Sequence, residues 1–224
     1  MGIHNKLSGI RVKNQSTTKQ KALSIVIAIT IGVILGLAAK LVDAQGVHPV
    51  FDAIGGRIGI WIFVATLISV FSHSPKLAAV KICSFFVSLL TVYYLYTVFV
   101  LHFFPMREIV FWGMCAVVSP VCAYVMWYAR GNGSVPSLVL ALPITAVLSE
   151  GYQLRDAYLP EHTHYYLIPI LMGIYLIMVI VLLLIVPTSR LKFLIILPIS
   201  IVLSFIIVYF NVLQRLFGGM NGVL

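Results

Sequence analysis

Long apolar blocks constrain this chain more than any motif does, because each is long enough to cross a lipid bilayer. A helix needs about 20 apolar residues, with a usable range of about 17 to 25, to span roughly 30 Å of hydrocarbon. The blocks are continuously apolar rather than alternating, which favours helices over a β-barrel. The sequence therefore predicts an all-α, polytopic helical membrane protein with seven transmembrane helices. The blocks are residues 22–41, 54–71, 77–104, 109–128, 135–154, 165–186 and 193–213.

Composition agrees, since 61% of the 224 residues are hydrophobic, 9% are charged and the mean hydropathy is +1.08. The bilayer is therefore the expected solvent for most of the chain. Residues 1–21 are polar and basic and are predicted to form a cytoplasmic leader, whereas residues 22–224 form a single transmembrane domain. No cleavable signal peptide is expected, because the first apolar block is long enough to span.

The fifth block is the doubtful one, because it contains Pro143 and reaches a useful length only by including Glu150. The alternative is a six-helix protein in which this block is re-entrant or a discontinuous helix. Of the 15 Lys and Arg residues, ten fall on the cytoplasmic side when the N-terminus is inside, and the six-helix alternative gives the same division. The positive-inside rule thus predicts a cytoplasmic N-terminus in the inner (cytoplasmic) membrane of the cell.

Small residues recur at four-residue spacing in the first block, at Ala28, Gly32 and Gly36, and again at Gly55 and Gly59. Such stripes let helix backbones approach closely in lipid. Packing within the chain is the favoured interpretation. The alternative is docking onto a partner membrane protein or a second copy of the chain.

Two charges, Arg57 and Glu150, abut or interrupt apolar blocks, and ionisable groups at membrane depth are candidates for function. They are placed to pair with each other. Tyr93 and Tyr96 belong to an aromatic stripe of the third block that either lines a ligand cavity or, more commonly for such stripes, packs. His102 lies at the end of the same block, on the outer side. These five residues are the predicted ligand-binding set.

Glu161 and His164 are weak metal candidates, because residues three apart share a helix face. Carboxylate-bridged metal sites use the Glu-x-x-His spacing, but they need it twice, and the chain has it once. No metal or other cofactor is predicted.

The sequence lacks the motifs that are typical of nucleotide-binding proteins and of hydrolases. The chain has neither a Walker A loop nor a Rossmann glycine pattern, so no nucleotide is expected. The Gly-x-Ser-x-Gly and His-Glu-x-x-His patterns of hydrolases are also missing. The positive charge gathers at the predicted membrane edge, where it suits anionic lipid rather than nucleic acid.

The first functional hypothesis is a membrane protein that binds or transports a small solute. In its size, its number of spans and the stripe at Gly32 and Gly36, the chain resembles the substrate-binding membrane subunits of vitamin uptake systems. That resemblance implies solute binding and docking through the stripe. Two alternatives stay open: a non-catalytic accessory or scaffold protein that associates through its small-residue helix faces, and an intramembrane enzyme using Glu150, His102 or His164.

Overall fold

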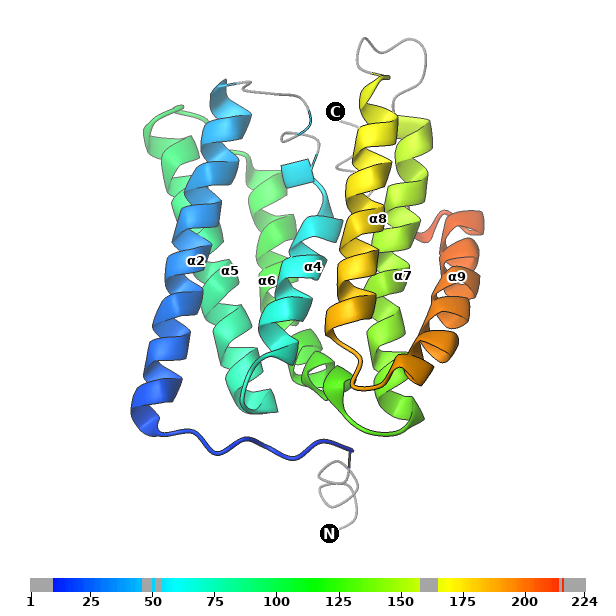
Figure 1. Ribbon diagram of the computed structural model, residues 1–224. Helices are drawn as coiled ribbons and strands as arrows, with labels where there is room; N and C mark the ends of the chain where they lie inside the picture. The colour runs from blue at the N-terminus through cyan, green and yellow to red at the C-terminus, as the bar shows by residue number, and fades with distance from the viewer. Residues whose placement is uncertain (1–9, 46–49, 51–53, 158–164, 214, 216–224) are drawn as a thin grey trace.

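The computed structural model describes residues 10–45, 50, 54–157, 165–213 and 215, and this part of the chain is all-α (Figure 1). Seven helices lie in the described residues, and each of them corresponds to one apolar block. They are α2 (Thr18–Gln45), α4 (Ile58–Val70), α5 (Pro75–Phe99), α6 (Met106–Met126), α7 (Ser134–Ala157), α8 (Leu167–Ile185) and α9 (Phe193–Tyr209). A short 3-10 helix, η1 (Trp127–Arg130), follows α6. A second one, η2 (Arg190–Lys192), precedes α9.

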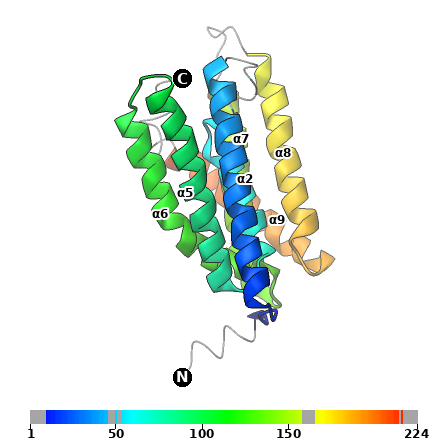
Figure 2. The ribbon, with the colours of Figure 1, turned by 90° about the vertical axis from the view of Figure 1, so that its left-hand side faces the viewer.

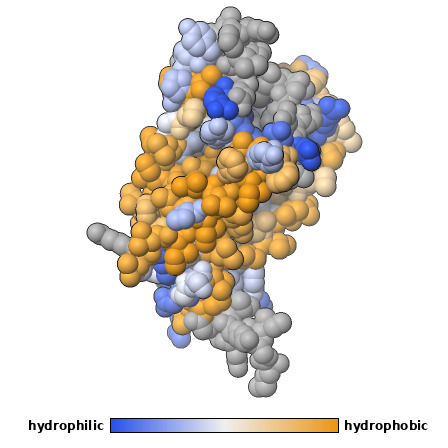
Figure 3. Space-filling view, turned by 90° about the vertical axis from the view of Figure 1, so that its right-hand side faces the viewer, coloured by the Kyte–Doolittle hydropathy of each residue, from blue (hydrophilic) through white to orange (hydrophobic). Residues whose placement is uncertain are grey.

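Successive helices run in alternating directions between two ends of the molecule, which are the upper and lower ends in Figure 1. Five of them, α2, α5, α6, α7 and α8, contain stretches long and apolar enough to cross a membrane, whereas α4 and α9 are apolar but shorter. An apolar belt lies between more polar ends on the face shown in Figure 3. The apolar helices indicate an integral membrane protein.

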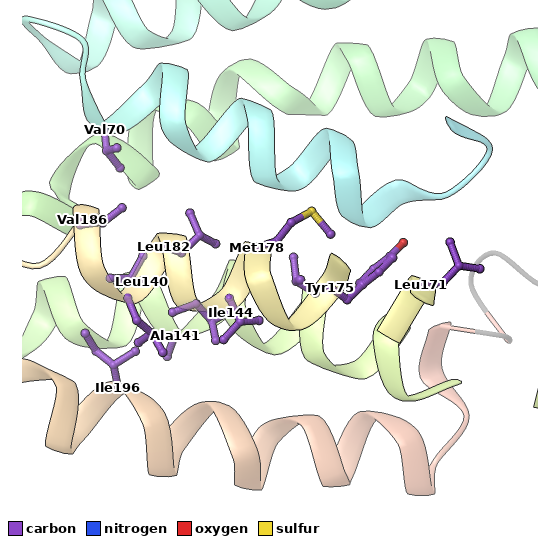
Figure 4. Close-up of a cluster of buried hydrophobic side chains, with 14 of the residues drawn as sticks. Val70, Leu140, Ala141, Ile144, Leu171, Tyr175, Met178, Leu182, Val186 and Ile196 are labelled. Carbon is purple, nitrogen blue, oxygen red and sulfur yellow. The ribbon is translucent and has the colours of Figure 1, made fainter. Parts of the chain in front are cut away.

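The buried core has two main parts that meet at α4. One lies among α4, α7, α8 and α9 and includes Leu140, Ile144 and Leu182 (Figure 4). The other joins α4 to α2 and α5 around Trp61 and Phe85. The short helix α4 thus contributes side chains to both parts of the core and lies between the two halves of the bundle.

The small-residue stripe of α2 packs against α5, and Figures 1 and 2 show these two helices side by side. A Cβ atom added at Gly36 would lie 2.5 Å from the carbonyl oxygen of Leu89, and one at Gly32 would meet the backbone and Ser88 of α5. Ala28 is buried in the same contact. The stripe is therefore covered by a helix of its own chain and offers no free surface there for partner docking.

Helix starts differ from the expected ones for identifiable reasons. Thr17 and Gln20 form a capping box, in which Gln20 N–H donates to Thr17 Oγ1 (3.3 Å) and Thr17 N–H donates to Gln20 Oε1 (3.0 Å). This box starts α2 at Thr18, inside the predicted polar leader. Ser74 caps α5 by accepting from Leu77 N–H at 3.2 Å, with Pro75 as the first helical residue.

The six-helix alternative required a break in the fifth block, but α7 is one helix from Ser134 to Ala157 with Pro143 inside it. Proline is tolerated within membrane helices when neighbours satisfy the backbone groups it frees. On α9, Ser200 donates to the carbonyl of Ala141 (3.4 Å) and Ser204 to that of Thr145 (3.1 Å). These bonds join α9 to the segment of α7 around the proline.

The segment before α2 is tied to the lower end of the bundle. Arg11 donates to the carbonyl oxygens of Val70 (3.0 Å) and Trp127, and its guanidinium lies 4.1 Å from the centre of the Trp127 ring. Trp127 Nε1 in turn donates to the carbonyl of Ser72 at 2.7 Å. Burial, and secondarily the charge of Arg130, lower the pKa of Arg11 to about 10, so the guanidinium stays charged at neutral pH. Arg11 therefore caps carbonyl groups at the ends of two helices.

Candidate functional site

The first turn of α4 is capped by a carboxylate that comes from another helix. Arg57 is the N-cap residue, with an extended backbone and no side-chain capping bond. The N–H groups of Ile58 and Gly59 donate instead to Glu150 of α7, at 3.2 Å to Oε1 and 2.6 Å to Oε2. These N–H groups have no partner inside their own helix, and the helix dipole favours a negative charge at this end. Glu150 therefore stabilises the start of α4.

Tyr175 of α8 supplies a third hydrogen bond to the same carboxylate. Its hydroxyl donates to Glu150 Oε2 at 3.0 Å. Tyr175 is 2% exposed and Glu150 is 8% exposed. Figure 4 shows the Tyr175 ring between α8 and α4, with its hydroxyl directed toward α4. Three helices thus meet at one buried carboxylate.

Two glycines make room for this contact. A Cβ at Gly59 would collide with Glu150 Oε2 and would lie 2.7 Å from the Tyr175 ring. A Cβ at Gly151 would lie 2.8 Å from Tyr175 Cβ. Gly59 was expected to serve helix packing; in the structure it also gives the carboxylate access to the helix end. No described atom lies within 4 Å of a Cβ built at Gly55, so that position makes no close helix contact with the described part of the chain.

Arg57 is the second charge of the site. The residue is only 8% exposed, and its Nε is buried without a hydrogen-bond partner in the described part of the chain. Its positive charge acts on Glu150 and on Tyr175, although the hydrogen bonds of the carboxylate come from the α4 backbone and from Tyr175. The structure thus brings Arg57 and Glu150 together as an electrostatic pair, with part of the guanidinium left unsatisfied.

The site lies below the upper end of the helices. Glu150 precedes the last residue of α7 by seven residues, which corresponds to about 10 Å at 1.5 Å per residue. The helix α4 has 13 residues and is therefore about 20 Å long. It begins four residues later than the apolar block at 54–71 predicts, after a turn at Gly56 and a bend at Arg57. The alternative reading placed an interruption in the fifth block; the structure has one in the second block instead, where it exposes a helix N-terminus to the interior.

The other predicted ligand-binding residues lie on a different part of the bundle. Tyr93 is on α5, and its ring lies 4.6 Å from Nζ of Lys40, a buried lysine of α2 that sequence reasoning did not single out. Tyr96 is half-buried on the same helix. His102 is exposed beyond the end of α5 and has a positive φ of 51°; the helix ends at Phe99, earlier than predicted. The helix α5 packs against α2, α4 and α6, whereas Glu150 lies among α4, α7 and α8.

The weak metal candidates, Glu161 and His164, lie outside the described residues. Among the residues that the structure describes, no group of three or more His, Cys, Asp or Glu side chains is placed to hold a metal ion. The described polar side chains that meet around Glu150 are therefore a carboxylate, a guanidinium and a phenol.

Sequence reasoning missed Tyr175 and Gly151. A signal for Tyr175 was present, because it is the only residue of α8 that carries a side-chain hydroxyl, amide or charged group. A tyrosine hydroxyl in a membrane helix needs a partner. The identity of that partner was not readable, because Glu150 lies 25 residues away and the α4 donors lie more than 90 residues from Glu150.

The arrangement suits a polar or charged molecule rather than an apolar one. A carboxylate is held by three donors beside a guanidinium with spare hydrogen-bonding capacity, at a depth where water does not freely screen charge. No family model matches the chain, and the searches of curated protein sequences and of solved structures also gave no match.

Proposed function

We propose that the protein binds a small polar solute and moves it across the cytoplasmic membrane, at the site formed by Arg57, Glu150 and Tyr175. The observation that carries this proposal is the buried Arg57, whose Nε has no hydrogen-bond partner among the residues that the structure describes. Burying a charged donor without a partner is costly. A bound solute that accepts from Arg57 would remove this cost.

The architecture supports a transport role for the site. Membrane transporters form substrate sites where a helix is interrupted at membrane depth, because the free backbone groups there bind polar ligands. The N-terminus of α4 is such an interruption, and it faces charged groups from α7 and from its own N-cap. The chain thus has a transporter-like site at the junction of its two halves.

The proposed topology has seven crossings with the N-terminus in the cytoplasm. The alternating directions of the helices favour it, as do Arg11, Lys76 and Lys192, which belong to segments at the lower end beside the start of the described chain (Figure 1). The helix α9, with 17 residues, is about 26 Å long and reaches the lower limit for a span. A C-terminal reporter is expected to give a signal on the outer side, and a cytoplasmic signal would contradict this topology.

The two other hypotheses receive less support. The scaffold hypothesis relied on the α2 stripe, which α5 covers. The enzyme hypothesis relied on Glu150, His102 or His164, and Glu150 is engaged by the α4 backbone and Tyr175. His102 is exposed beyond the end of α5, and His164 lies outside the described residues.

Binding is tested by thermal stabilisation of the purified protein in detergent against a fixed set of solutes. The set contains acetate, lactate, benzoate, phosphate, chloride, choline and glucose. At least one solute should raise the unfolding temperature of the wild type and not that of Arg57→Gln. Arg107→Gln, which changes an exposed arginine at the same end, serves as the matched control and should respond like the wild type. Equal responses from all three proteins, or none, would count against the site.

A further inference from the structure

The donors at the α4 N-terminus and Arg57 form a site built for a carboxylate. We infer, resting on the proposed function, that the transported solute carries a small carboxylate group and that its binding is coupled to the uptake of one proton by Glu150. The juxtaposition that supports this is a buried carboxylate occupying the same donors that an anionic solute would need.

The geometry around Glu150 defines the ligand chemistry. One carboxylate oxygen accepts from Ile58 N–H at 3.2 Å, and the other accepts from Gly59 N–H at 2.6 Å and from the Tyr175 hydroxyl at 3.0 Å. Two adjacent backbone donors that each take one oxygen match the spacing of a carboxylate. The Glu150 carboxylate therefore indicates the chemical group that a free ligand would present to these donors.

Arg57 provides the second, independent indication of an anion. It is more than nine-tenths buried, it stands at the N-cap of the same helix, and no described residue accepts a hydrogen bond from its Nε. The guanidinium and the helix N-terminus together carry more than one unit of positive charge. Among the described residues, Glu150 supplies one negative charge to balance them, and it does not accept from Nε.

Charge balance then couples the ligand to a proton. A second anion beside an ionised Glu150 would place two negative charges in one buried site, and like charges at close range disfavour this strongly. If Glu150 takes a proton, the acid is neutral, and the incoming carboxylate becomes the single negative charge beside Arg57. Among the described residues, the ionisable groups that face Glu150 are Arg57 from α4 and Tyr175 from α8. The helix α9 also packs on α7, and its one ionisable side chain is Tyr209.

The exchange balances in protons and charge. A proton from the outer water bonds to a carboxylate oxygen of Glu150 and makes a carboxylic acid. The Ile58 and Gly59 N–H groups are then free to donate to the solute carboxylate, which also accepts from Arg57. On release at the inner side, the proton leaves Glu150 and the carboxylate re-forms its bonds to α4. One anion and one proton cross together, and the cycle moves no net charge.

The test measures radiolabelled acetate, lactate and benzoate binding to the purified wild type and to Glu150→Gln between pH 5 and pH 9. The apparent dissociation constant of the wild type should rise about tenfold per pH unit above the pKa of Glu150, because one proton must be taken up. Glu150→Gln resembles the protonated acid, so it should bind the carboxylate with no such slope and at least tenfold more tightly than the wild type at pH 8. Glu108→Gln, on α6, is the control and should keep the wild-type slope.

The outcomes separate this inference from the proposed function. Binding of choline or glucose but of no carboxylate overturns the inference and leaves solute binding in place. Carboxylate binding with a flat pH profile in the wild type also overturns it. If no solute of the set binds the wild type at any pH, both fail. Should Glu150→Gln be unstable alone, the wild-type slope decides, together with proton uptake on mixing acetate with weakly buffered protein.

Discussion

Removal of the Glu150 carboxylate is expected to destabilise the protein strongly, because three buried donors lose their acceptor at once. In Glu150→Ala, the N–H groups of Ile58 and Gly59 and the hydroxyl of Tyr175 lose bonds of 3.2, 2.6 and 3.0 Å, and Arg57 loses its compensating charge. Leaving one partner of a buried charged contact alone costs about 3 to 5 kcal/mol. For a chain of about this size, each kcal/mol lowers the unfolding temperature by about 2 to 4 °C. The expected decrease is therefore of the order of 10 °C.

Glu150→Gln separates loss of the acceptor from loss of the charge. The amide oxygen still accepts from one or two of the donors, so this variant should lose about 1 to 2 kcal/mol. The assay is thermal unfolding of the purified protein in detergent, followed by tryptophan fluorescence. Glu108→Ala, which removes a half-buried carboxylate on α6, is the control and should change the unfolding temperature by no more than a few degrees. A Glu150→Ala protein as stable as the wild type, or a Gln variant as unstable as the Ala variant, would refute the capping contact.

Three further contacts of the bundle are tested by substitution. Gly59→Ala should cost about 1 to 3 kcal/mol because its Cβ collides with Glu150, while Gly55→Ala, which meets no described atom, should be nearly neutral in the same thermal assay. Gly36→Leu should separate α2 from α5 and lower the yield of folded protein on size-exclusion chromatography; an unchanged monomer peak and unfolding temperature would contradict the packing. Arg11→Ala should cost about 1 to 3 kcal/mol and increase amide exchange at the lower end of α4, and unchanged exchange there would count against the clamp.

The positions of the helices were readable from the sequence because apolar length is a local property. Each apolar block corresponds to a helix in the described structure, and errors are confined to ends and breaks. The start of α2 was misplaced because the capping box at Thr17 and Gln20 extends the helix into polar sequence. The break that the six-helix alternative placed at Pro143 is not found, because α7 continues through the proline, and serines of α9 bond to its backbone in that region.

Of the residues that form the site, only the two charged ones were predicted together from the sequence. Arg57 and Glu150 stood out because ionisable groups are rare in apolar blocks, and the structure places them together. The partners that complete the site are backbone N–H groups, which have no sequence signal, and Tyr175, whose contact depends on how α8 packs against α7. Tyr93 and His102 were predicted to share one site with Arg57 and Glu150, but they lie apart from it because α5 belongs to the other half of the bundle.

The most direct test of the central claim is uptake into proteoliposomes of whichever solute stabilises the purified protein. The account predicts uptake above that of empty liposomes for the wild type and for the control Arg107→Gln. It predicts a decrease of at least tenfold for Arg57→Gln, because the buried guanidinium is the group that holds the solute. Uptake by the wild type that equals that of empty liposomes, or uptake that Arg57→Gln leaves unchanged, would contradict the claim.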